Sequence, residues 1–121
     1  MFSDPTAVTI DSVAKNLIKI NQDAFASEYL LKETDGEFRL RMRHSEYKRS
    51  PNNVTVERHN VELTHTLYGA TTADPPIIRK TYVVFEIERG DDIAAAVSET
   101  IGLADFLAAA GIVAKLANWE S

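Results

Sequence analysis

The chain has 121 residues, a formal net charge of −5 and no cysteine. A chain of this length forms one domain that can bury about two thirds of its unfolded surface. Hydrophobic content of 45% and charged content of 26% are those of an ordinary globular protein. The absence of cysteine excludes disulfides, thiolate metal sites and cysteine nucleophiles.

The N-terminal sequence lacks the basic start and the apolar core of a signal peptide. No apolar stretch approaches the ~18 residues that a membrane-spanning helix needs. We therefore expect a protein that is made and used in a cytoplasm, with no membrane partner.

Charge is distributed unevenly along the chain. Residues 38–58 contain six Lys or Arg and two acids, whereas the segment from Asp91 to the end contains five acids and one lysine. The local field, and not the net charge, decides what each side of a folded protein attracts. The basic region is thus a candidate site for an anionic partner despite the acidic total.

The first three quarters of the chain show the alternation and the turn signals of successive β-strands. Asp11-Ser12 predicts a short hairpin near the N-terminus, and Tyr68–Pro76 is the clearest loop. The predicted strands are Thr6–Ile10, Val13–Ile20, Ala24–Leu31, Glu37–Tyr47, Val54–Leu67 and Ile77–Arg89.

The fifth predicted strand contains one irregularity. Val61, Leu63 and Leu67 define its buried face, and Val54 and Val56 fall on the opposite face. This change of phase predicts either a β-bulge or an extra contact near the preceding turn.

Two helices are predicted after Gly90. Asp91 or Asp92 can cap the first helix, and Gly111 marks its end. A shorter second helix follows, and we expect Trp119 to anchor it, with a role as a base-stacking platform as the alternative. The apolar residues that repeat at helical spacing are Ile93, Val97, Ile101, Ala104, Ala108, Ile112 and Leu116.

Strands followed by helices define an α+β fold: an antiparallel β-sheet of about five strands with an N-terminal hairpin, and then two C-terminal helices. The helices can cover only one face of the sheet, so the other face is expected to be wet or covered by a ligand. A meander also leaves exposed edges, which dimerisation edge to edge would satisfy. We expect a single domain, residues 1–121, with a hairpin (1–22), a sheet meander (23–90) and helices (91–121).

Arg39, Arg41 and Arg43 stand at every second position of the fourth predicted strand. Successive side chains of a strand point to opposite faces, so the three arginines line one face, roughly 6.5–7 Å apart. Like charges side by side repel, and folding alone gains little from them. The alternatives are a solvated strand face and a binding surface for an anion. The face that the helices leave open also carries Arg58, Asn60, Lys80 and Tyr82.

In the order and length of its elements, the chain resembles the coat proteins of the small single-stranded RNA bacteriophages, the leviviruses. The segments most similar to Caulobacter-type members are 19–23 (KINQD), 57–62 (ERHNVE) and 118–121 (NWES). The resemblance covers nearly the whole sequence, although no single motif is diagnostic.

The resemblance implies a structural capsid protein of the virion, made and assembled in the host bacterial cytoplasm. It implies an interlocked dimer with a continuous sheet, each chain's helices packing over its partner, and an icosahedral shell whose sheet faces single-stranded genomic RNA. It also implies binding of a genomic hairpin that represses replicase translation. The RNA-binding residues expected on the sheet are Arg39, Arg41, Arg43, Arg58, Asn60, Glu62, Lys80 and Tyr82.

The resemblance places Tyr82 where a tyrosine stacks on a base. Three arginines stand where familiar coats mix hydroxyls with charges, and Val84 stands where an asparagine reads RNA. These departures favour packaging through the RNA backbone.

Other classes of function leave no pattern in the sequence. His44, His59 and His65 lack the spacing of metal ligands, and no nucleophile elbow or phosphate loop is present, so we expect no enzyme and no cofactor. Asp91 and Asp92 suit a helix cap, with a calcium site at subunit contacts as the alternative. The alternative functions are a non-viral dimeric single-stranded RNA-binding protein and a small α+β domain that binds an acidic ligand.

Overall fold

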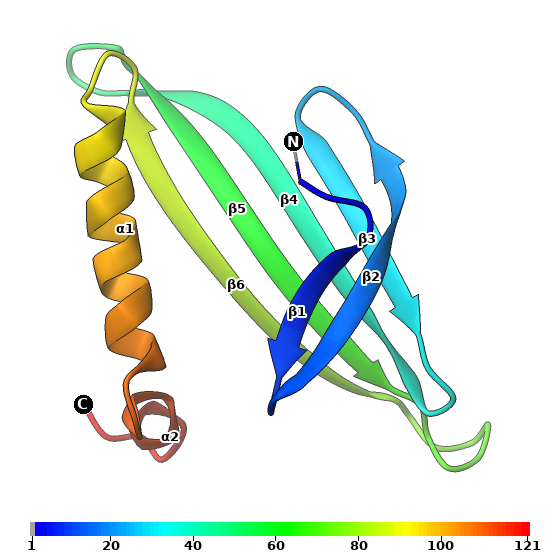
Figure 1. Ribbon diagram of the computed structural model, residues 1–121. Coiled ribbons are helices and arrows are strands. Elements are labelled where there is room, and N and C mark those ends of the chain that lie inside the picture. Colours follow the sequence, from blue (N-terminus) through cyan, green and yellow to red (C-terminus); the bar gives the residue numbers. More distant parts are fainter. Residues whose placement is uncertain (1) are drawn as a thin grey trace.

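The computed structural model describes residues 2–121. Six strands form one antiparallel sheet in sequence order, and two helices follow (Figure 1). The strands are β1 (Thr6–Ile10), β2 (Val13–Gln22), β3 (Ala26–Lys32), β4 (Gly36–Arg49), β5 (Val54–Leu67) and β6 (Ile77–Glu88), and the helices are α1 (Ile93–Ala108) and α2 (Ile112–Ala117). The prediction of an α+β fold is confirmed. The hairpin strands join the same sheet as the others, so the sheet has six strands and not about five.

The strand boundaries follow from local contacts. β3 begins two residues later than predicted because the Asp23 carboxylate accepts hydrogen bonds from the backbone N–H groups of Phe25 and Ala26, both at 2.8 Å, and so holds a turn. β4 begins at Gly36, where a Cβ atom would collide with the backbone carbonyl oxygen of Thr66. Only glycine therefore allows β4 and β5 to approach this closely.

The irregularity in β5 is an extra contact and not a bulge. The β4–β5 register is continuous from Gly36 opposite Leu67 to Arg49 opposite Val54. Val56 is nevertheless buried. Two side-chain contacts between β4 and β6 pass over it: an ion pair of Arg49 with Glu88, and a hydrogen bond of 2.8 Å that the Tyr47 hydroxyl donates to Glu86.

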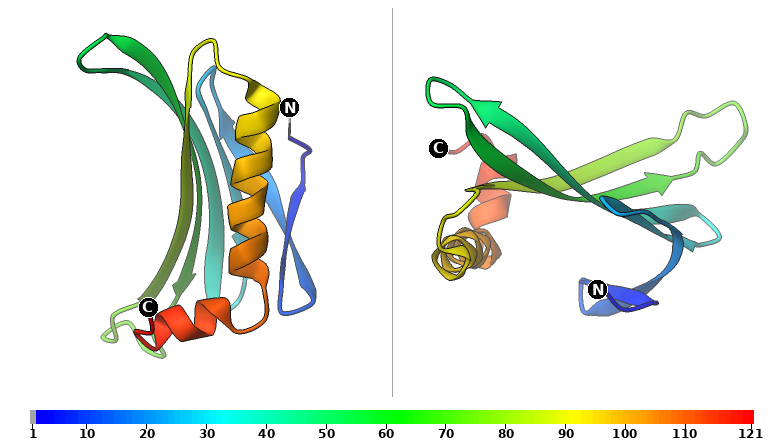
Figure 2. Two further views of the ribbon diagram at one scale, coloured as in Figure 1. Left: turned by 90° about the vertical axis from the view of Figure 1, so that its left-hand side faces the viewer. Right: turned by 90° about the horizontal axis from the view of Figure 1, so that it is seen from above.

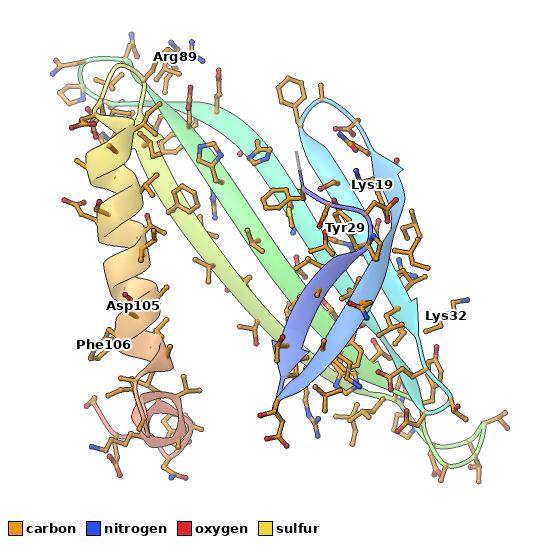
Figure 3. All side chains as sticks on the ribbon, viewed as in Figure 1. Lys19, Tyr29, Lys32, Arg89, Asp105 and Phe106 are labelled. Atoms are coloured by element: carbon orange, nitrogen blue, oxygen red, sulfur yellow. The ribbon has the colours of Figure 1, made fainter. Side chains whose placement is uncertain are left out.

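The hydrophobic core lies on one face of the sheet, here called the core face, which bears Phe38, Leu40 and Met42. These side chains pack with Leu17 and Tyr29, and each of the five is at most 5% exposed. The β1–β2 hairpin curls over this face and adds Val8 and Ile10 (Figure 2). Lys19 of the hairpin also lies over the Tyr29 ring, 5.7 Å from its centroid (Figure 3). The arginines of β4 are consequently left on the opposite face, here called the arginine face.

The helices do not cover the sheet of their own chain. After Gly90, which has a φ of 93°, α1 turns back and runs beside the outer edge of β6 (Figures 1 and 2). No residue of α1 or α2 is buried. The reason lies in the connection: α1 follows the edge strand directly, and the hairpin occupies the core face over the middle of the sheet.

The start of α1 agrees with the sequence prediction, whereas its end at Ala108 comes before the predicted Gly111. The Asp92 carboxylate caps α1 and accepts a hydrogen bond of 3.0 Å from the backbone N–H of Ala94. Gly111, in the left-handed conformation with a φ of 82°, separates α1 from α2. Trp119, however, is 95% exposed, so it does not anchor the helix against the part of the chain that the structure describes. The helices thus present their apolar side chains to solvent, among them Phe106 in Figure 3.

Candidate nucleic-acid interface

The strand register places the predicted site residues on one face in cross-strand rows. Arg39, Thr64 and Lys80 form one row across β4, β5 and β6. The next row is Arg41, Glu62 and Tyr82, and it is followed by Arg43, Asn60 and Val84 and then by Ser45, Arg58 and Glu86. Because directly opposed residues of a sheet share a face, the eight predicted residues all lie on the arginine face.

The sequence suggested that the arginines of β4 stand side by side without counter-charges. In the structure each of them is paired with a carboxylate. Arg39 donates to Glu28 at 2.6 Å and to Glu37 at 3.1 Å, and Arg41 donates to Glu28 at 3.2 Å. Arg43 donates to Glu62 at 2.5 Å. Carboxylates from β3, β4 and β5 therefore separate the arginines and remove most of their mutual repulsion.

Glu62 is the most deeply placed charge on this face. Its side chain is 7% exposed and is held between Arg43 and Lys80, whose Nζ lies 3.3 Å from Oε1. Burial raises the pKa of Glu62, but the hydrogen bond from Lys80 and the charges of Lys80 and Arg43 outweigh it, so the pKa lies below its ordinary value. Glu62 stays ionised and fixes the position of both cations.

Glu28 likewise stays ionised and fixes the position of its cations at the β3 side of the face. The hydrogen bond from Arg39 lowers the pKa of its carboxyl, burial opposes this, and Arg41 adds to the lowering. The partner carboxylates raise the pKa of Arg39, chiefly through the hydrogen bond to Glu28. Sequence analysis missed Glu28 and Glu37. The turn at Asp35-Gly36 was the available signal, because pairing of the flanking strands around it places Glu28 opposite Arg41.

The face still carries an excess of positive charge. In strands β3 to β6 seven basic side chains lie on it with five carboxylates, an excess of two positive charges for each chain. The basic residues are Lys32, Arg39, Arg41, Arg43, Arg49, Arg58 and Lys80, and the acids are Glu28, Glu37, Glu62, Glu86 and Glu88. Arg58 is exposed and makes no ion pair within residues 2–121, and Arg43 is 53% exposed. These two arginines are the best placed to bind an external anion.

A hollow of about 600 Å³ lies where β4 and β5 meet the turn that precedes β3. Arg43, Ser45, Arg58 and Asn60 line its side on the arginine face. The Asn60 Oδ1 atom is buried and has no hydrogen-bond partner in the described part of the chain. A buried acceptor without a partner is costly, and a donor from a bound molecule would satisfy it.

Tyr82 lies on the edge strand, in the same row as Arg41 and Glu62, and is 63% exposed. Its ring contributes little to the core and is free to stack on a planar group. Arginine planes and exposed aromatic rings on an open sheet are the elements by which sheet proteins bind single-stranded RNA.

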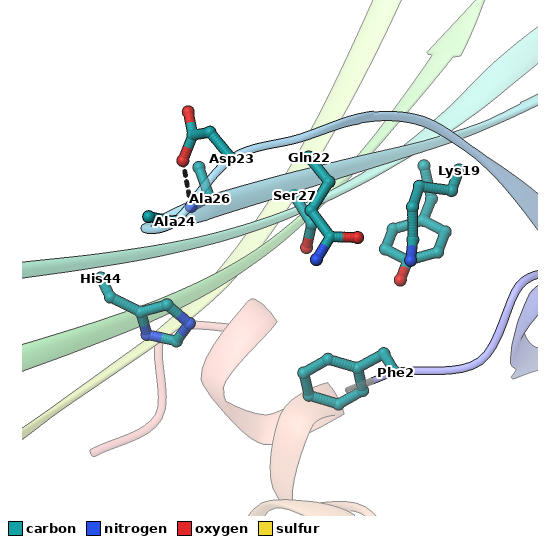
Figure 4. A pocket seen from close by; sticks show the side chains of 9 residues that line it. Phe2, Lys19, Gln22, Asp23, Ala24, Ala26, Ser27 and His44 are labelled. Atoms are coloured by element: carbon teal, nitrogen blue, oxygen red, sulfur yellow. Dashed lines mark hydrogen bonds between the residues drawn. The ribbon is translucent and has the colours of Figure 1, made fainter.

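A second hollow, of about 390 Å³, contains a serine, a histidine and an aspartate, a set that could suggest hydrolysis (Figure 4). Its geometry does not support that chemistry. Asp23 is occupied by the backbone N–H groups of its turn, and no hydrogen bond joins His44 to Ser27 within residues 2–121. The Nδ1 atom of His44 lies instead 2.8 Å from Nδ1 of His59.

The described residues contain neither a cluster of metal-binding side chains nor a helix that could span a membrane. Across residues 2–121 no group of three or more His, Cys, Asp or Glu side chains could hold a metal ion. Asp92 serves as the cap of α1, and its backbone N–H is bound by the Asp91 carboxylate at 2.7 Å. Over the same range no helix has the length and hydropathy required to cross a bilayer.

Comparison with known proteins identifies the class and then the family. Two solved structures share the fold over almost the whole chain. The virus-like particle of bacteriophage ESE058 has a TM-score of 0.67 at 15% identity and covers 95% of this chain and 93% of its own. The virus-like particle of bacteriophage AVE019 has a TM-score of 0.67 at 9% identity and covers 96% and 94%. No curated protein matches the sequence significantly.

The fold is therefore that of a phage coat protein. The sequence model described as "Phage phiCb5, coat protein" matches residues 3–88, which is most of the chain, and the chain belongs to this coat protein family. The resemblance inferred from sequence is confirmed. The protein is a structural capsid protein of the virion and not an enzyme.

Proposed function

We propose that the chain forms a dimer, assembles in the host bacterial cytoplasm into an icosahedral shell, and packages single-stranded RNA on the arginine face. One observation supports this proposal above the others. The arginine face is the polar, basic side of the sheet, whereas the hairpin, with Val8 and Ile10 against the core, and the ribbon of α1 lie toward the other side (Figure 2).

The dimer is supported by surfaces that one chain leaves uncovered. β6 has a neighbour in the sheet on one side only. Exposed strand edges invite pairing with another chain. α1 and α2 also expose Ile101, Leu103, Phe106 and Leu116 to more than half of their full area. A second copy that pairs at β6 would cover these side chains with its own sheet, which makes the dimer obligate.

RNA binding is expected to act mainly through phosphates. Arginine suits this task because its planar fork donates two hydrogen bonds to one phosphate and also stacks on bases. If the two subunits neutralise about six phosphates, affinity falls by roughly a thousandfold between 50 and 200 mM salt. The unsatisfied acceptor of Asn60 adds a contact to a base donor. Such a contact is what repression through a genomic hairpin would require.

The test replaces the ion pairs of the arginine face by neutral side chains, because removal of the arginines alone would leave the buried Glu62 with Lys80 as its only cation. Arg39, Arg41 and Arg43 are changed to Thr, and Glu28, Glu37 and Glu62 to Gln. The matched control neutralises an ion pair on the core side, Lys15 with Glu33, which are 2.9 Å apart.

The purified variants are compared by sedimentation, negative-stain microscopy and the ratio of absorbance at 260 and 280 nm. We expect the face variant to form dimers and shells that contain little RNA, and the control to package RNA normally. Equal RNA content in the two would mean that the arginine face is only a solvated surface. Failure of the unmodified chain to form uniform particles would favour the alternative of an RNA-binding protein without a shell.

A further inference from the structure

β6 forms a free edge of the sheet. It has 12 residues and only β5 as a neighbour in the sheet. α1 runs beside its free edge but stands away from it, and a hollow of about 540 Å³ remains between them. Val83 and Phe85 line the hollow from the strand, and Leu103 and Leu107 line it from the helix. Figure 1 shows this edge of β6 facing α1, with no further strand beyond it.

Two-fold symmetry allows only a few registers for such a pair. In an antiparallel pair of identical strands, one residue lies opposite its own copy, and directly opposed residues share a face. Near the middle of β6 the candidates for this central residue are Thr81, Tyr82, Val83 and Val84. Registers centred on Tyr82 or Val83 pair the longest part of the strand.

The charges on β6 discriminate between these registers. A centre at Val84 would place Lys80 opposite the partner's Glu88 twice, but it would also place Arg79 opposite the partner's Arg89 twice and would pair a shorter part of β6 than a centre at Val83. In registers centred on Thr81 or Tyr82, no oppositely charged residues face each other directly. A centre at Val83 places Lys80 opposite the partner's Glu86, again twice, and brings two valines together at the axis. Opposed charges stabilise a strand pair and like charges weaken it.

Lys80 and Glu86 can each form this additional contact. The Lys80 side chain is 54% exposed and contacts Glu62 at 3.3 Å, which leaves ammonium protons free. In Glu86 the Oε2 atom accepts from the Tyr47 hydroxyl at 2.8 Å, and Oε1 has no partner within residues 2–121. Across the axis the groups would form a chain of contacts that runs from Glu62 through Lys80 to Glu86 and Tyr47 of the partner subunit.

We infer that two copies pair through β6 in the register that places Val83 opposite its own copy and Lys80 opposite the partner's Glu86. This inference rests on the proposed dimer and specifies its interface. The register joins the two arginine faces into one surface and brings the two Tyr82 side chains near the axis, each opposite the partner's Val84.

The chain has no cysteine, so single cysteine substitutions report the register directly. Four variants are compared: Thr81→Cys, Tyr82→Cys, Val83→Cys and Val84→Cys. Directly opposed residues have Cα atoms about 4.5–5.5 Å apart, within the range of a disulfide, whereas a shift of the centre by one residue separates the two copies to about 8 Å. We expect Val83→Cys to cross-link at least about tenfold faster than the others under mild oxidation, as seen on a gel without reductant.

Sedimentation of the unmodified chain distinguishes a failure of the proposed dimer from a failure of the assigned register. A folded monomer would overturn the proposed dimer and the register with it. A dimer in which another of the four variants cross-links faster, or in which none does, would overturn the register alone. Val83 is 45% exposed, so the substitution is tolerated by the fold, which circular dichroism of each variant checks.

A charge reversal tests the same register without oxidation. Glu86→Lys would place two lysines opposite each other at each end of the pair and weaken dimerisation by about tenfold or more. Tyr47→Phe is the matched control, since it removes the hydrogen bond to Glu86 and keeps the charge. An unchanged dissociation constant for Glu86→Lys would overturn the assigned pairing with Lys80.

Discussion

Arg43 donates a hydrogen bond of 2.5 Å to Glu62, a carboxylate whose side chain is only 7% exposed. A basic residue that faces solvent is thus fixed by an acid that lies beneath it. A buried carboxylate is tolerated only when it is paired, so Glu62 needs its cations for the stability of the sheet. The same cations are candidates for RNA binding. Arg43 is therefore expected to contribute both to the stability of the sheet and to RNA binding. Arg58 is expected to contribute to binding alone, because it has no carboxylate partner within residues 2–121.

Arg43→Ser and Arg58→Ser are expected to differ in stability. Loss of Arg43 leaves Glu62 with Lys80 alone and lowers the free energy of unfolding by about 1–3 kcal/mol. Loss of Arg58 changes it by less than about 0.5 kcal/mol, since the side chain is exposed and unpaired. Urea denaturation of the dimers measures both values.

The same two variants are expected to agree in RNA binding. Each should weaken binding and reduce its salt dependence by about one phosphate contact. Arg79→Ser, which removes an exposed arginine on the core face of β6, serves as the control. Equal stability of the two face variants would contradict the linkage at Glu62.

Acid is expected to weaken the fold through Glu28 and Glu62. The pKa of each carboxyl is lowered in the folded chain from its ordinary value of 4.5, by ion pairing with the arginines and Lys80. A lowered folded pKa means that the stabilisation is fully present above that ordinary value and is lost as pH falls through the folded pKa. The free energy of unfolding should therefore decline below about pH 4.5.

Urea denaturation between pH 7 and pH 3 measures this decline. Glu28→Gln with Glu62→Gln should flatten the curve in the acidic range, because neither side chain then binds a proton. Glu120→Gln, at an exposed position near the C-terminus, should leave the curve unchanged. An equally steep decline in the double variant would show that other groups cause the acid sensitivity.

Tyr82→Ala is expected to weaken RNA binding by about 1–3 kcal/mol if the ring stacks on a base. The loss should vary little with salt, in contrast to the loss caused by Arg58→Ser, because stacking involves no counterion release. Tyr82→Phe keeps the ring and should retain the affinity. Filter binding of single-stranded RNA at several salt concentrations measures these effects, and sedimentation checks that the dimer persists. Equal losses in Phe and Ala variants would exclude stacking.

The loop between β5 and β6 is expected to act in assembly and not in folding. It is closed internally, since the Asp74 carboxylate accepts from both the backbone N–H and the hydroxyl of Thr71, at 3.2 and 3.1 Å. Deletion of residues 71–73 should leave dimers folded and impair or redirect shell formation, as seen by light scattering and microscopy. Ala73→Ser, an exposed substitution in the same loop, is the control. Normal particles in normal yield from the deletion would contradict this role.

Much of the fold could be predicted because its signals are local. Alternation in β4 separates Arg39 and Arg41 from Phe38 and Leu40 whatever the rest of the chain does. Asp92 has the residue type of a helix cap and serves as one. The identities of the strands and the order of elements follow from such signals, which also carried the resemblance to phage coat proteins.

The partners of the arginines could not be predicted in the same way. Glu28 is eleven residues from Arg39, and Glu62 is nineteen from Arg43, and they meet only because neighbouring strands pair in one register. The burial of Val56 likewise depends on side chains of β4 and β6 that pass over β5. Residues on separate strands become neighbours through hydrogen bonding between those strands, and a sequence pattern along one strand does not contain that pairing.

The sequence by itself determined the elements and the two faces of each strand, because these depend on the period of side chains along the backbone, and the order of the elements carried the resemblance that indicated the class of protein. Only the tertiary structure decided how the elements combine. It showed that the hairpin, and not the helices, covers the core, and that α1 stands beside β6 with its apolar side chains exposed. The direction of a helix after a turn is set by packing between distant segments, and in the described part of this chain α1 has no buried residue.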